Sequence, residues 1–332
     1  MTSSLEGTVL VTGGAGYIGS HTVRALRQAG RDVVVFDSLE LGHREAVIDA
    51  PLVVGDIHDK DLVTATCNEH GVTQLVHFAA YKAVGESMEQ PAKYWRNNVA
   101  GSVELYEACL ASGVNDVVFS SSCSVNGNPD TMPLTETAAI APESVYAESK
   151  AMVERILHWY GQTSDMRSVA LRYFNAAGAS FDSRIGEDWA HSQNLVPLAM
   201  KAVLLKDRRL KVFGDDYDTP DGTCIRDYIH VDDLADAHVK ALDYLGNGGD
   251  TVAVNVGTGV GSSVLDVLNA TAEAAGEPVP YDMAPRRAGD PVVTYADPSF
   301  AKETLGWEAR YGLREIIDSA HAWHASQHGG TR

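Results

Sequence analysis

Tyr146 and Lys150 lie four residues apart in the segment VYAESK. If this segment opens a helix, both side chains share one face, so that the lysine ammonium lies close to the phenol. A free tyrosine has a pKa of about 10 and is a poor base at neutral pH, but a neighbouring cation favours the phenolate. The pair therefore predicts a tyrosine that accepts a proton. The competing interpretation is an ordinary Tyr/Lys pair on a solvated helix.

Gly13, Gly16 and Gly19 follow the apolar run VLV with the spacing G-x-x-G-x-x-G. In a loop between a strand and a helix, the first glycine permits the turn and the second lets the backbone approach a pyrophosphate. The third lets the helix pack closely, and the helix N-terminus offers N–H groups to the anion. The spacing therefore predicts a dinucleotide-binding loop.

Asp37 ends a second apolar run, VVVF. A carboxylate there accepts hydrogen bonds from the adenosine ribose and repels a 2′-phosphate, which favours NAD over NADP. The alternative is an acidic residue that opens a surface turn. Three serines, Ser120 to Ser122, end another apolar run and bring hydroxyls that can share a substrate proton. Together with the glycine loop, they favour a catalytic Tyr146 beside a positively charged nicotinamide ring.

Short apolar, β-branched runs alternate with segments of helical composition such as 21–29 and 60–70. Runs that are apolar throughout suit a parallel sheet buried on both faces. The pattern predicts an α/β fold with a doubly wound parallel (Rossmann) sheet. The expected strands are Thr8–Thr12, Val33–Asp37, Leu52–Gly55, Gln74–Ala80, Asp116–Ser121 and Ser168–Phe174.

The regular alternation fails after about residue 180. We therefore expect an NAD-binding domain over 1–180 and a smaller C-terminal substrate-binding α/β domain over 181–332. Thr251–Gly257 (TVAVNVG) still has the composition of a buried strand, so the chain is expected to return to the main sheet. Loops of the smaller domain should cover the carboxyl edge of the strands, where ligands bind in open α/β folds.

The chain has 332 residues and a formal charge of −19. This charge argues against nucleic acid or an anionic membrane as a partner and means that an anionic ligand needs a local cationic pocket. The four cysteines have neither paired spacing nor the density of a disulfide framework, so we expect reduced thiols. With no apolar stretch of membrane-spanning length, a soluble cytoplasmic enzyme is expected.

The chain resembles the extended short-chain dehydrogenases/reductases and, among them, the UDP-glucose (UDP-galactose) 4-epimerase family. The resemblance runs from the first strand to about Asp297, and the KAVGES and RDYIHV segments narrow it to the epimerases. The segments that carry it, in the family's order, are TGGAGYIGSH, HFAAYKAVGES, NNVAGS, FSSSCSV, YAESK, LRYFNAAGA, GTCIRDYIHVDDLADAH, GVGSSVLDV and APRRAGD.

The resemblance implies a catalytic triad of Ser122, Tyr146 and Lys150. It also implies an NAD site and a UDP-sugar site. The cofactor positions are Gly13, Gly16, Tyr17, Ile18, Gly19, Asp37, Asp56, Ile57, Phe78, Ala79, Lys82, Asn97, Tyr146, Lys150 and Tyr173. The substrate positions are Lys82, Ser122, Tyr146, Asn175, Asn194, Leu195, Phe213, Arg226, Arg287, Asp290 and Thr294.

The implied reaction interconverts UDP-galactose and UDP-glucose through a transient 4-keto sugar, with NAD retained throughout. Two arginines, Arg226 and Arg287, would supply the local positive charge that an anionic ligand needs in a protein of negative net charge. The resemblance also implies a homodimer formed by helices around Tyr94–Ala111 and Tyr146–Gly161. Apolar residues on them (Val103, Leu105, Ile156 and Leu157) are equally compatible with burial against their own sheet.

Three positions depart from the family pattern. Asn126 replaces an aromatic residue after the serine strand, and Ala80 replaces a glycine. Thr294 replaces the bulky tyrosine found where the substrate is restricted to glucose and galactose. A small residue there predicts some activity on UDP-N-acetylhexosamines, unless the neighbouring Tyr295 fills the space.

Alternatives to this function remain open. A 4,6-dehydratase is disfavoured because the Asp-Glu pair that eliminates water is missing after Ser122. A 4-epimerase of UDP-glucuronate or a UDP-pentose, and a non-catalytic NAD-binding regulator, are the remaining alternatives. No metal site is expected: His230, Asp232, Asp233 and His238 are explained by the start of a helix, whose dipole favours aspartates. The histidines 321, 324 and 328 are expected on an exposed terminal helix.

Overall fold

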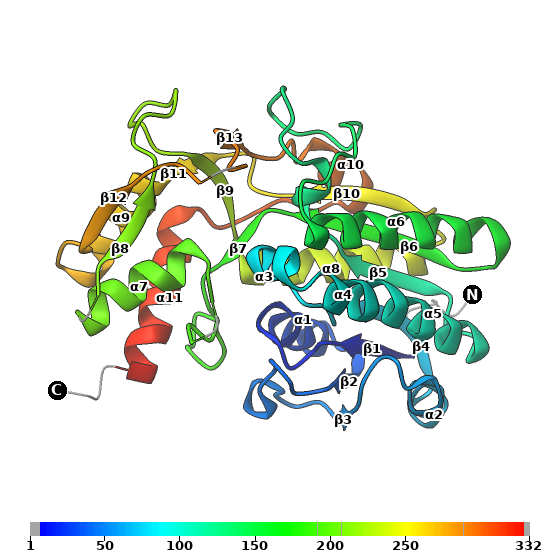
Figure 1. Cartoon of the computed structure of the whole chain (residues 1–332). Coiled ribbons are helices and arrows are strands. Elements are labelled where there is room, and N and C mark those ends of the chain that lie inside the picture. The colour runs from blue at the N-terminus through cyan, green and yellow to red at the C-terminus, as the bar shows by residue number, and fades with distance from the viewer. Residues whose placement is uncertain (1–6, 191, 207, 288, 329–332) are drawn as a thin grey trace.

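The computed structural model describes residues 7–190, 192–206, 208–287 and 289–328. Its main sheet has seven parallel strands in the spatial order β10-β6-β5-β4-β1-β2-β3 (Figure 1). This confirms the doubly wound α/β fold, and each strand lies within a few residues of an expected run. The strands are β1 Thr8–Thr12, β2 Asp32–Asp37, β3 Leu52–Val54, β4 Val72–His77, β5 Asp116–Ser120, β6 Arg167–Tyr173 and β10 Val252–Val256.

Helices cover both faces of this sheet. On one face, α1 (Tyr17–Gln28), α8 (Val231–Gly246) and α10 (Ser299–Leu305) contribute buried apolar side chains to the core. On the other face, the core includes α2 (Lys60–His70), α5 (Ser102–Ala111) and α6 (Val145–Thr163). Because α8, β10 and α10 follow residue 180 in sequence, the chain returns to the main sheet. A division into domains at residue 180 stays a prediction.

The helix predicted over 94–111 is present, but its winding changes along its length. The backbone stays helical from α4 (Pro91–Tyr94) through a π-helical segment η2 (Trp95–Gly101) into α5. Within this segment the amide of Asn98 bonds both backbone groups of Tyr81, at 2.9 and 3.0 Å. The wider π turn fixes the loop after β4 in this way, and such segments are frequent at functional sites.

A smaller α/β unit lies beside the carboxyl edge of the main sheet, on the left in Figure 1. The central strand β9 pairs with β7, β11 and β13, and β8 pairs with β12. Three helices enclose its core. The bounds are β7 Asn175–Ala177, α7 Leu195–Leu205, β8 Leu210–Phe213, β9 Ile225–His230, β11 Gly261–Ser263, α9 Val264–Ala275, β12 Tyr281–Ala284, β13 Val293–Thr294 and α11 Leu313–His328.

The terminal helix α11 corrects one expectation. It packs against α7 and α9, and His324 is only 3 % exposed; His321 is half-buried, whereas His328 is exposed as expected. The ring of His324 stacks on Trp189 with centroids 4.8 Å apart. The polar composition of this segment misled the prediction because histidine buries well against an aromatic face.

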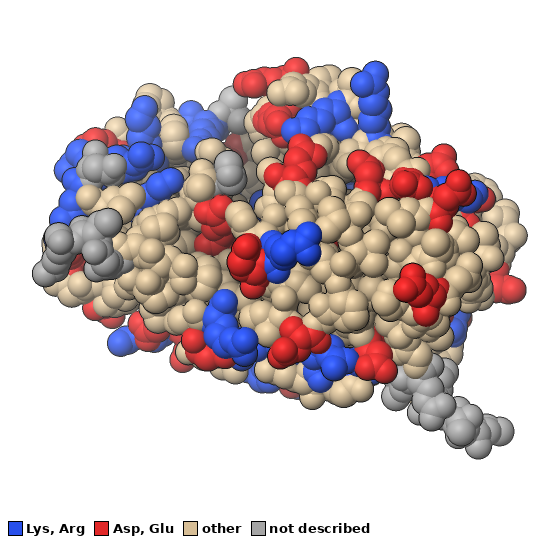
Figure 2. All heavy atoms as spheres, turned by 90° about the horizontal axis from the view of Figure 1, so that it is seen from below, with Lys and Arg blue, Asp and Glu red and all other residues tan. Residues whose placement is uncertain are grey.

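Three of the four apolar residues considered for a dimer interface pack on the protein's own core. Leu105 and Leu157 are fully buried against the main sheet, Ile156 is half-buried against the same core, and Val103 is half-buried. Trp159, on the same helix as Ile156, is 65 % exposed. Within the described residues, no helix is both long and apolar enough to span a membrane. Viewed from below, basic side chains gather at the left end of the molecule, whereas acidic and basic side chains intermingle over the rest of this face (Figure 2).

Candidate active site

The glycine loop joins β1 to α1 and leaves no room for larger residues. Gly13 has a φ of +72°, and a Cβ atom there would lie 2.6 Å from the backbone nitrogen of Ala79, after β4. A Cβ atom on Gly19 would overlap the carbonyl oxygen of Gly13. Gly16 precedes the first residue of α1 in extended conformation. The loop thus keeps the close backbone cradle at a helix N-terminus that a pyrophosphate requires.

Asp37 at the end of β2 supports this loop directly. Its carboxylate accepts hydrogen bonds from the backbone N–H groups of Ala15 at 2.9 Å and Leu39 at 2.8 Å. Each carboxylate oxygen can accept a further bond, so this bracing is compatible with the predicted ribose contact.

The other predicted cofactor residues follow the ends of neighbouring strands. Asp56 and Ile57 follow β3, where the Asp56 carboxylate bonds Nδ1 of His58 at 2.6 Å. Phe78 and Ala79 follow β4, and both backbone nitrogens donate to the carbonyl of Thr12. The structure therefore brings these residues to the same edge as the glycine loop. The remaining members lie in α1 (Tyr17, Ile18), after β4 (Lys82), in η2 (Asn97) and at the end of β6 (Tyr173).

Tyr146, Lys150 and Ser122 meet at this edge. Ser144 caps α6 by accepting a hydrogen bond from the N–H of Ala147, so Tyr146 lies in the first turn and Lys150 one turn later. The Lys150 Nζ atom lies 6.0 Å from the centre of the Tyr146 ring and donates to the carbonyl oxygen of Ser120 at 2.7 Å. The Ser122 hydroxyl accepts a hydrogen bond from Ser124 Oγ at 2.9 Å and lies close enough to Tyr146 to act on the pKa of its phenol.

Burial controls the protonation of this pair. It raises the pKa of Tyr146 well above its ordinary value, whereas the hydrogen bond with Ser122 acts in the opposite direction. Burial also lowers the pKa of Lys150 to about 7, while the Glu154 carboxylate acts to raise it. Desolvation disfavours the charged form of both groups. Burial thus favours the neutral phenol, whereas positive charge next to the phenol favours the phenolate.

The arginines predicted to bind the nucleotide lie in the smaller unit. Arg226 is on β9, and its charge acts to lower the pKa of Cys123, the residue that follows Ser122. Arg287 packs its guanidinium 3.9 Å from the centre of the Phe213 ring. Arg287 and Asp290, like Arg226, act electrostatically on Cys224. The charges of both arginines therefore reach Cys224, and that of Arg226 also reaches Cys123, the neighbour of the predicted catalytic serine.

Comparison with known proteins agrees with this geometry. Residues 9–257 match the model of the NAD dependent epimerase/dehydratase family. The UDP-glucose 4-epimerase of Rhizobium leguminosarum bv. trifolii is 48% identical over 96% of this chain and 97% of its own length. The chain belongs to the NAD-dependent epimerase/dehydratase family.

Solved structures of family members have the same fold. A UDP-glucose 4-epimerase from Brucella ovis in complex with NAD matches with a TM-score of 0.93 and 45% identity, covering 95% of this chain and 98% of that one. The UDP-Glc/GlcNAc 4-epimerase of Campylobacter jejuni matches with a TM-score of 0.85 and 39% identity, covering 96% and 99%. The resemblance seen in the sequence and the expectation of NAD are confirmed. These relatives favour neither a dehydratase nor a non-catalytic regulator.

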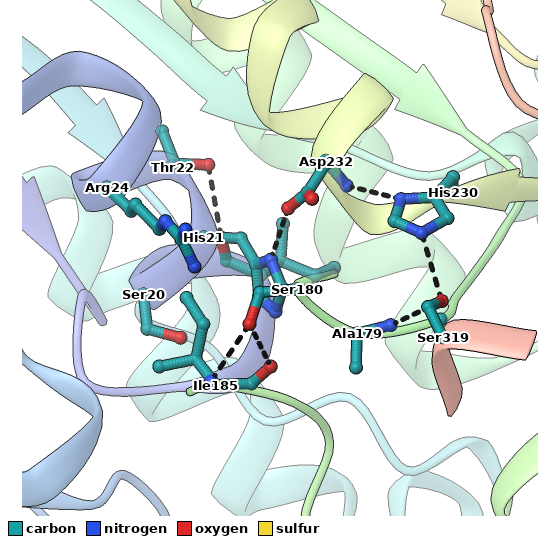
Figure 3. Close-up of polar contacts among 12 residues, drawn as sticks. Ser20, His21, Thr22, Arg24, Ala179, Ser180, Ile185, His230, Asp232 and Ser319 are labelled. Carbon is teal, nitrogen blue, oxygen red and sulfur yellow. Dashed lines mark hydrogen bonds and ion pairs between the residues drawn. The ribbon is translucent and has the colours of Figure 1, made fainter. Parts of the chain in front are cut away.

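A polar network joins α1, the helix that follows the glycine loop, to the smaller unit (Figure 3). On α1, His21 bonds the Asp232 carboxylate at 2.6 Å, at the start of α8. Next to Asp232, His230 bonds Ser319 of α11 at 3.0 Å, and Ser319 also accepts the N–H of Ala179. His230 and Asp232, two of the residues considered and discounted as metal ligands, thus connect elements, with Asp232 in the first turn of a helix as expected.

The substrate positions outside the arginine region are placed as follows. Asn175 donates from Nδ2 to the carbonyl of Asp227 at 2.9 Å. Thr294 is 7 % exposed and lies opposite Arg226 in the β13–β9 pair. Its hydroxyl has no hydrogen-bond partner among the described residues. Asn194 and Leu195 mark the start of α7.

Asn126, a departure from the family pattern, has a structural role. It is buried, and its Nδ2 donates to the carbonyls of Ala138 and Ala139 at 3.2 and 3.0 Å. The side chain thereby ties the 138–139 loop to the end of the catalytic serine segment.

Sequence reasoning missed two carboxylates near the site. Glu154 accepts hydrogen bonds from Ser121 at 2.5 Å and from Arg172, beside the serine strand end. Its position one turn after Lys150 on the same helical face was a usable signal. Glu187 lies in an irregular segment, where no spacing rule applies.

Proposed function

We propose that this protein interconverts UDP-galactose and UDP-glucose by inverting C4 of the hexose, with NAD as its resident cofactor. The proposal is carried by one observation: Ser122, Tyr146 and Lys150 meet on the main sheet at the place where Arg226 approaches from the smaller unit. Hydrogen-transfer groups thus adjoin a site for an anionic nucleotide. The relatives named above are UDP-glucose 4-epimerases.

The cofactor is held at the carboxyl edge of β1 to β4. The glycine loop would receive the pyrophosphate, Asp37 would accept from the adenosine ribose, and Asp56 and Ile57 would contact the adenine. Phe78, Ala79, Lys82 and Asn97 would lie around the pyrophosphate and the nicotinamide ribose. When bound, NAD supplies reversible hydride acceptance at its nicotinamide ring.

Tyr146 takes the proton of the sugar's 4-hydroxyl and later returns it, with the Ser122 hydroxyl in the hydrogen-bond path. Because burial raises the pKa of Tyr146, the phenol needs positive charge close by to act as a base. Lys150, whose Nζ lies 6.0 Å from the ring centre, supplies that charge when protonated. The positively charged nicotinamide ring acts in the same direction.

The nucleotide and the hexose are held unequally. Arg226 and Arg287 bind the diphosphate, Asp290 accepts from the uridine ribose, and Phe213 lines the same pocket. Asn175, Asn194 and Leu195 border the sugar with neutral side chains. The UDP therefore stays clamped while the hexose can turn its opposite face towards the cofactor.

Thr294 extends the substrate range to UDP-N-acetylhexosamines. Threonine is small, and Tyr295 does not replace it, because the Tyr295 ring lies beside Gly261 of β11. The Campylobacter jejuni relative is named as a UDP-Glc/GlcNAc 4-epimerase. We expect turnover of UDP-GalNAc by the native protein and its loss in Thr294→Tyr, with UDP-galactose still converted. Absence of UDP-GalNAc turnover beside good UDP-galactose turnover would contradict this extension.

A cytoplasmic homodimer completes the proposal. Val103 is half-buried on α5 and Trp159 is exposed on α6, which leaves apolar surface for a helix-to-helix contact between two copies. The four cysteines are free thiols, which suits a reducing compartment. Sedimentation velocity of the purified protein tests the dimer.

Proton NMR of UDP-galactose with the purified protein and no added NAD tests the function. Conversion to a stable mixture rich in UDP-glucose is expected, and Tyr146→Phe should abolish it. If the native protein converts nothing, even with added NAD, the proposed substrate is wrong.

A further inference from the structure

Glu187 is a carboxylate between the two parts of the molecule that the mechanism above does not use. It is 5 % exposed. Its Oε1 atom accepts hydrogen bonds from Ser192 Oγ at 2.8 Å and Asn194 Nδ2 at 3.0 Å, and it lies 3.4 Å from Lys82 Nζ. Lys82 follows β4 of the main sheet, whereas Asn194 begins α7 of the smaller unit. One carboxylate oxygen therefore joins a cofactor position to a sugar position.

The side chain of Asn194 has an unusual orientation for its place. Asparagine before the first turn of a helix commonly accepts a hydrogen bond from a backbone N–H of that turn. Here the side chain makes no capping bond, and its Nδ2 turns to Glu187 instead. An ionised carboxylate only accepts hydrogen bonds. It therefore fixes the nitrogen end of the amide towards itself and leaves the oxygen end directed away.

We propose that Glu187 is a positioning residue that orients the side chains of Asn194 and Lys82 for UDP-sugar binding. This inference rests on the proposed function. Through Asn194, Glu187 presents the amide oxygen as an acceptor for a hydroxyl of the substrate. Through Lys82, it holds the ammonium at the boundary between the sugar and the cofactor, because opposite charges at 3.4 Å attract.

Contacts other than those of the carboxylate also hold the backbone around Glu187. The carbonyl oxygen of Glu187 accepts a hydrogen bond from Trp323 Nε1 at 3.1 Å, and the adjacent Gly186 lies close against the same indole ring. Asp188 pairs with His43 at 3.1 Å. Removing the Glu187 charge should therefore leave this segment in place, which makes a conservative substitution informative.

Glu187→Gln keeps the shape of the side chain, but its amide can offer a donor to Asn194 and no longer attracts Lys82. In steady-state assays with UDP-galactose, using the protein with the NAD it retains on purification, we expect KM to rise about tenfold, the effect of losing one hydrogen bond to a charged group. The kcat value should change by less than about threefold, because the proton-transfer groups are untouched.

Two further variants separate positioning from general stability. In an Asn194→Ala background, adding Glu187→Gln should raise KM by clearly less than tenfold, since one of its two targets is already gone. Asp188→Asn, a matched control on the same segment, should leave KM unchanged. Melting temperature is measured for every variant.

The outcomes are distinct. A wild-type KM in Glu187→Gln, or a full tenfold effect in both backgrounds, overturns the inference. A KM rise in Asp188→Asn equal to that in Glu187→Gln, with the same fall in melting temperature, also overturns it, since the segment would then act only by staying folded. If the native protein does not convert UDP-galactose, the proposed function fails separately. Calorimetric binding of UDP-galactose to the same variants then decides the inference without turnover.

Discussion

The buried Lys150 should make the stability of the protein depend on pH in a way that one substitution removes. Lys150 is 3 % exposed, and burial lowers its pKa from 10.5 to about 7. Between pH 7 and pH 9 the unfolded chain keeps this proton while the folded protein releases it. Because the unfolded state then binds more protons, the free energy of unfolding rises with pH over this window.

The size of the effect follows from the two pKa values. A full proton difference changes the free energy of unfolding by about 1.4 kcal/mol per pH unit. At pH 7 the folded lysine is about half protonated, and by pH 9 it is almost fully neutral, which together give a gain of about 2 kcal/mol. Tyr146 does not interfere, because its pKa is raised further above this window.

The assay is urea unfolding of the wild type and Lys150→Met at pH 7, 8 and 9 without added nucleotide. Methionine has a similar length and no titrating group, so every other ionisation cancels in the difference between the two proteins. The wild type should gain about 2 kcal/mol relative to the variant across this range. Parallel pH profiles would refute the claim that burial keeps Lys150 neutral above pH 7.

Asn126→Ala should lower the free energy of unfolding by about 1–3 kcal/mol, since two carbonyls of the 138–139 loop lose their donor; urea unfolding measures this. Equal turnover of the native protein and Asn126→Tyr would show that the departure from the family pattern is silent in catalysis. Leu105→Ala should cost about 2–5 kcal/mol, because the side chain is fully buried, whereas Val103→Ala should cost clearly less. A similar loss for both would contradict the assigned burial of α5.

The strands and the cofactor loop were predictable because local chemistry decides them. A run such as VVVF, apolar throughout, has no solvent-facing side, so only a strand buried on both faces suits it. At Gly13, the positive φ and the close approach of Ala79 exclude any side chain. Because only glycine is tolerated at such positions, the spacing of the glycines can be recognised in the sequence. The π-helical winding at η2 was not predictable, since it accompanies hydrogen bonds between Asn98 and Tyr81, a residue in another loop.

The same contrast holds within the site. Tyr146 and Lys150 can be recognised from the sequence because their spacing of four residues equals about one helical turn. Glu187 contacts its partners only once the segment after β7 has folded between β4 and α7. A carboxylate in a polar, irregular segment is ordinarily solvated, so neither its burial nor its three contacts follow from its neighbours in sequence. Long-range contacts of this kind are decided by packing between elements and become visible only in the structure.

The division of the site between two structural units has a consequence for mutational effects. Ser122, Tyr146 and Lys150 all belong to the segment from β5 to α6 and are fixed by one core. Arg226 and Thr294 lie on β9 and β13 of the smaller unit, whose position relative to that core depends on contacts such as the hydrogen bond from the Tyr17 hydroxyl of α1 to the carbonyl of Gly178 after β7, at 2.7 Å, and the network in Figure 3. Changes at those contacts should therefore shift KM for the nucleotide sugar more than kcat, because they move the substrate clamp while leaving the proton-transfer geometry intact.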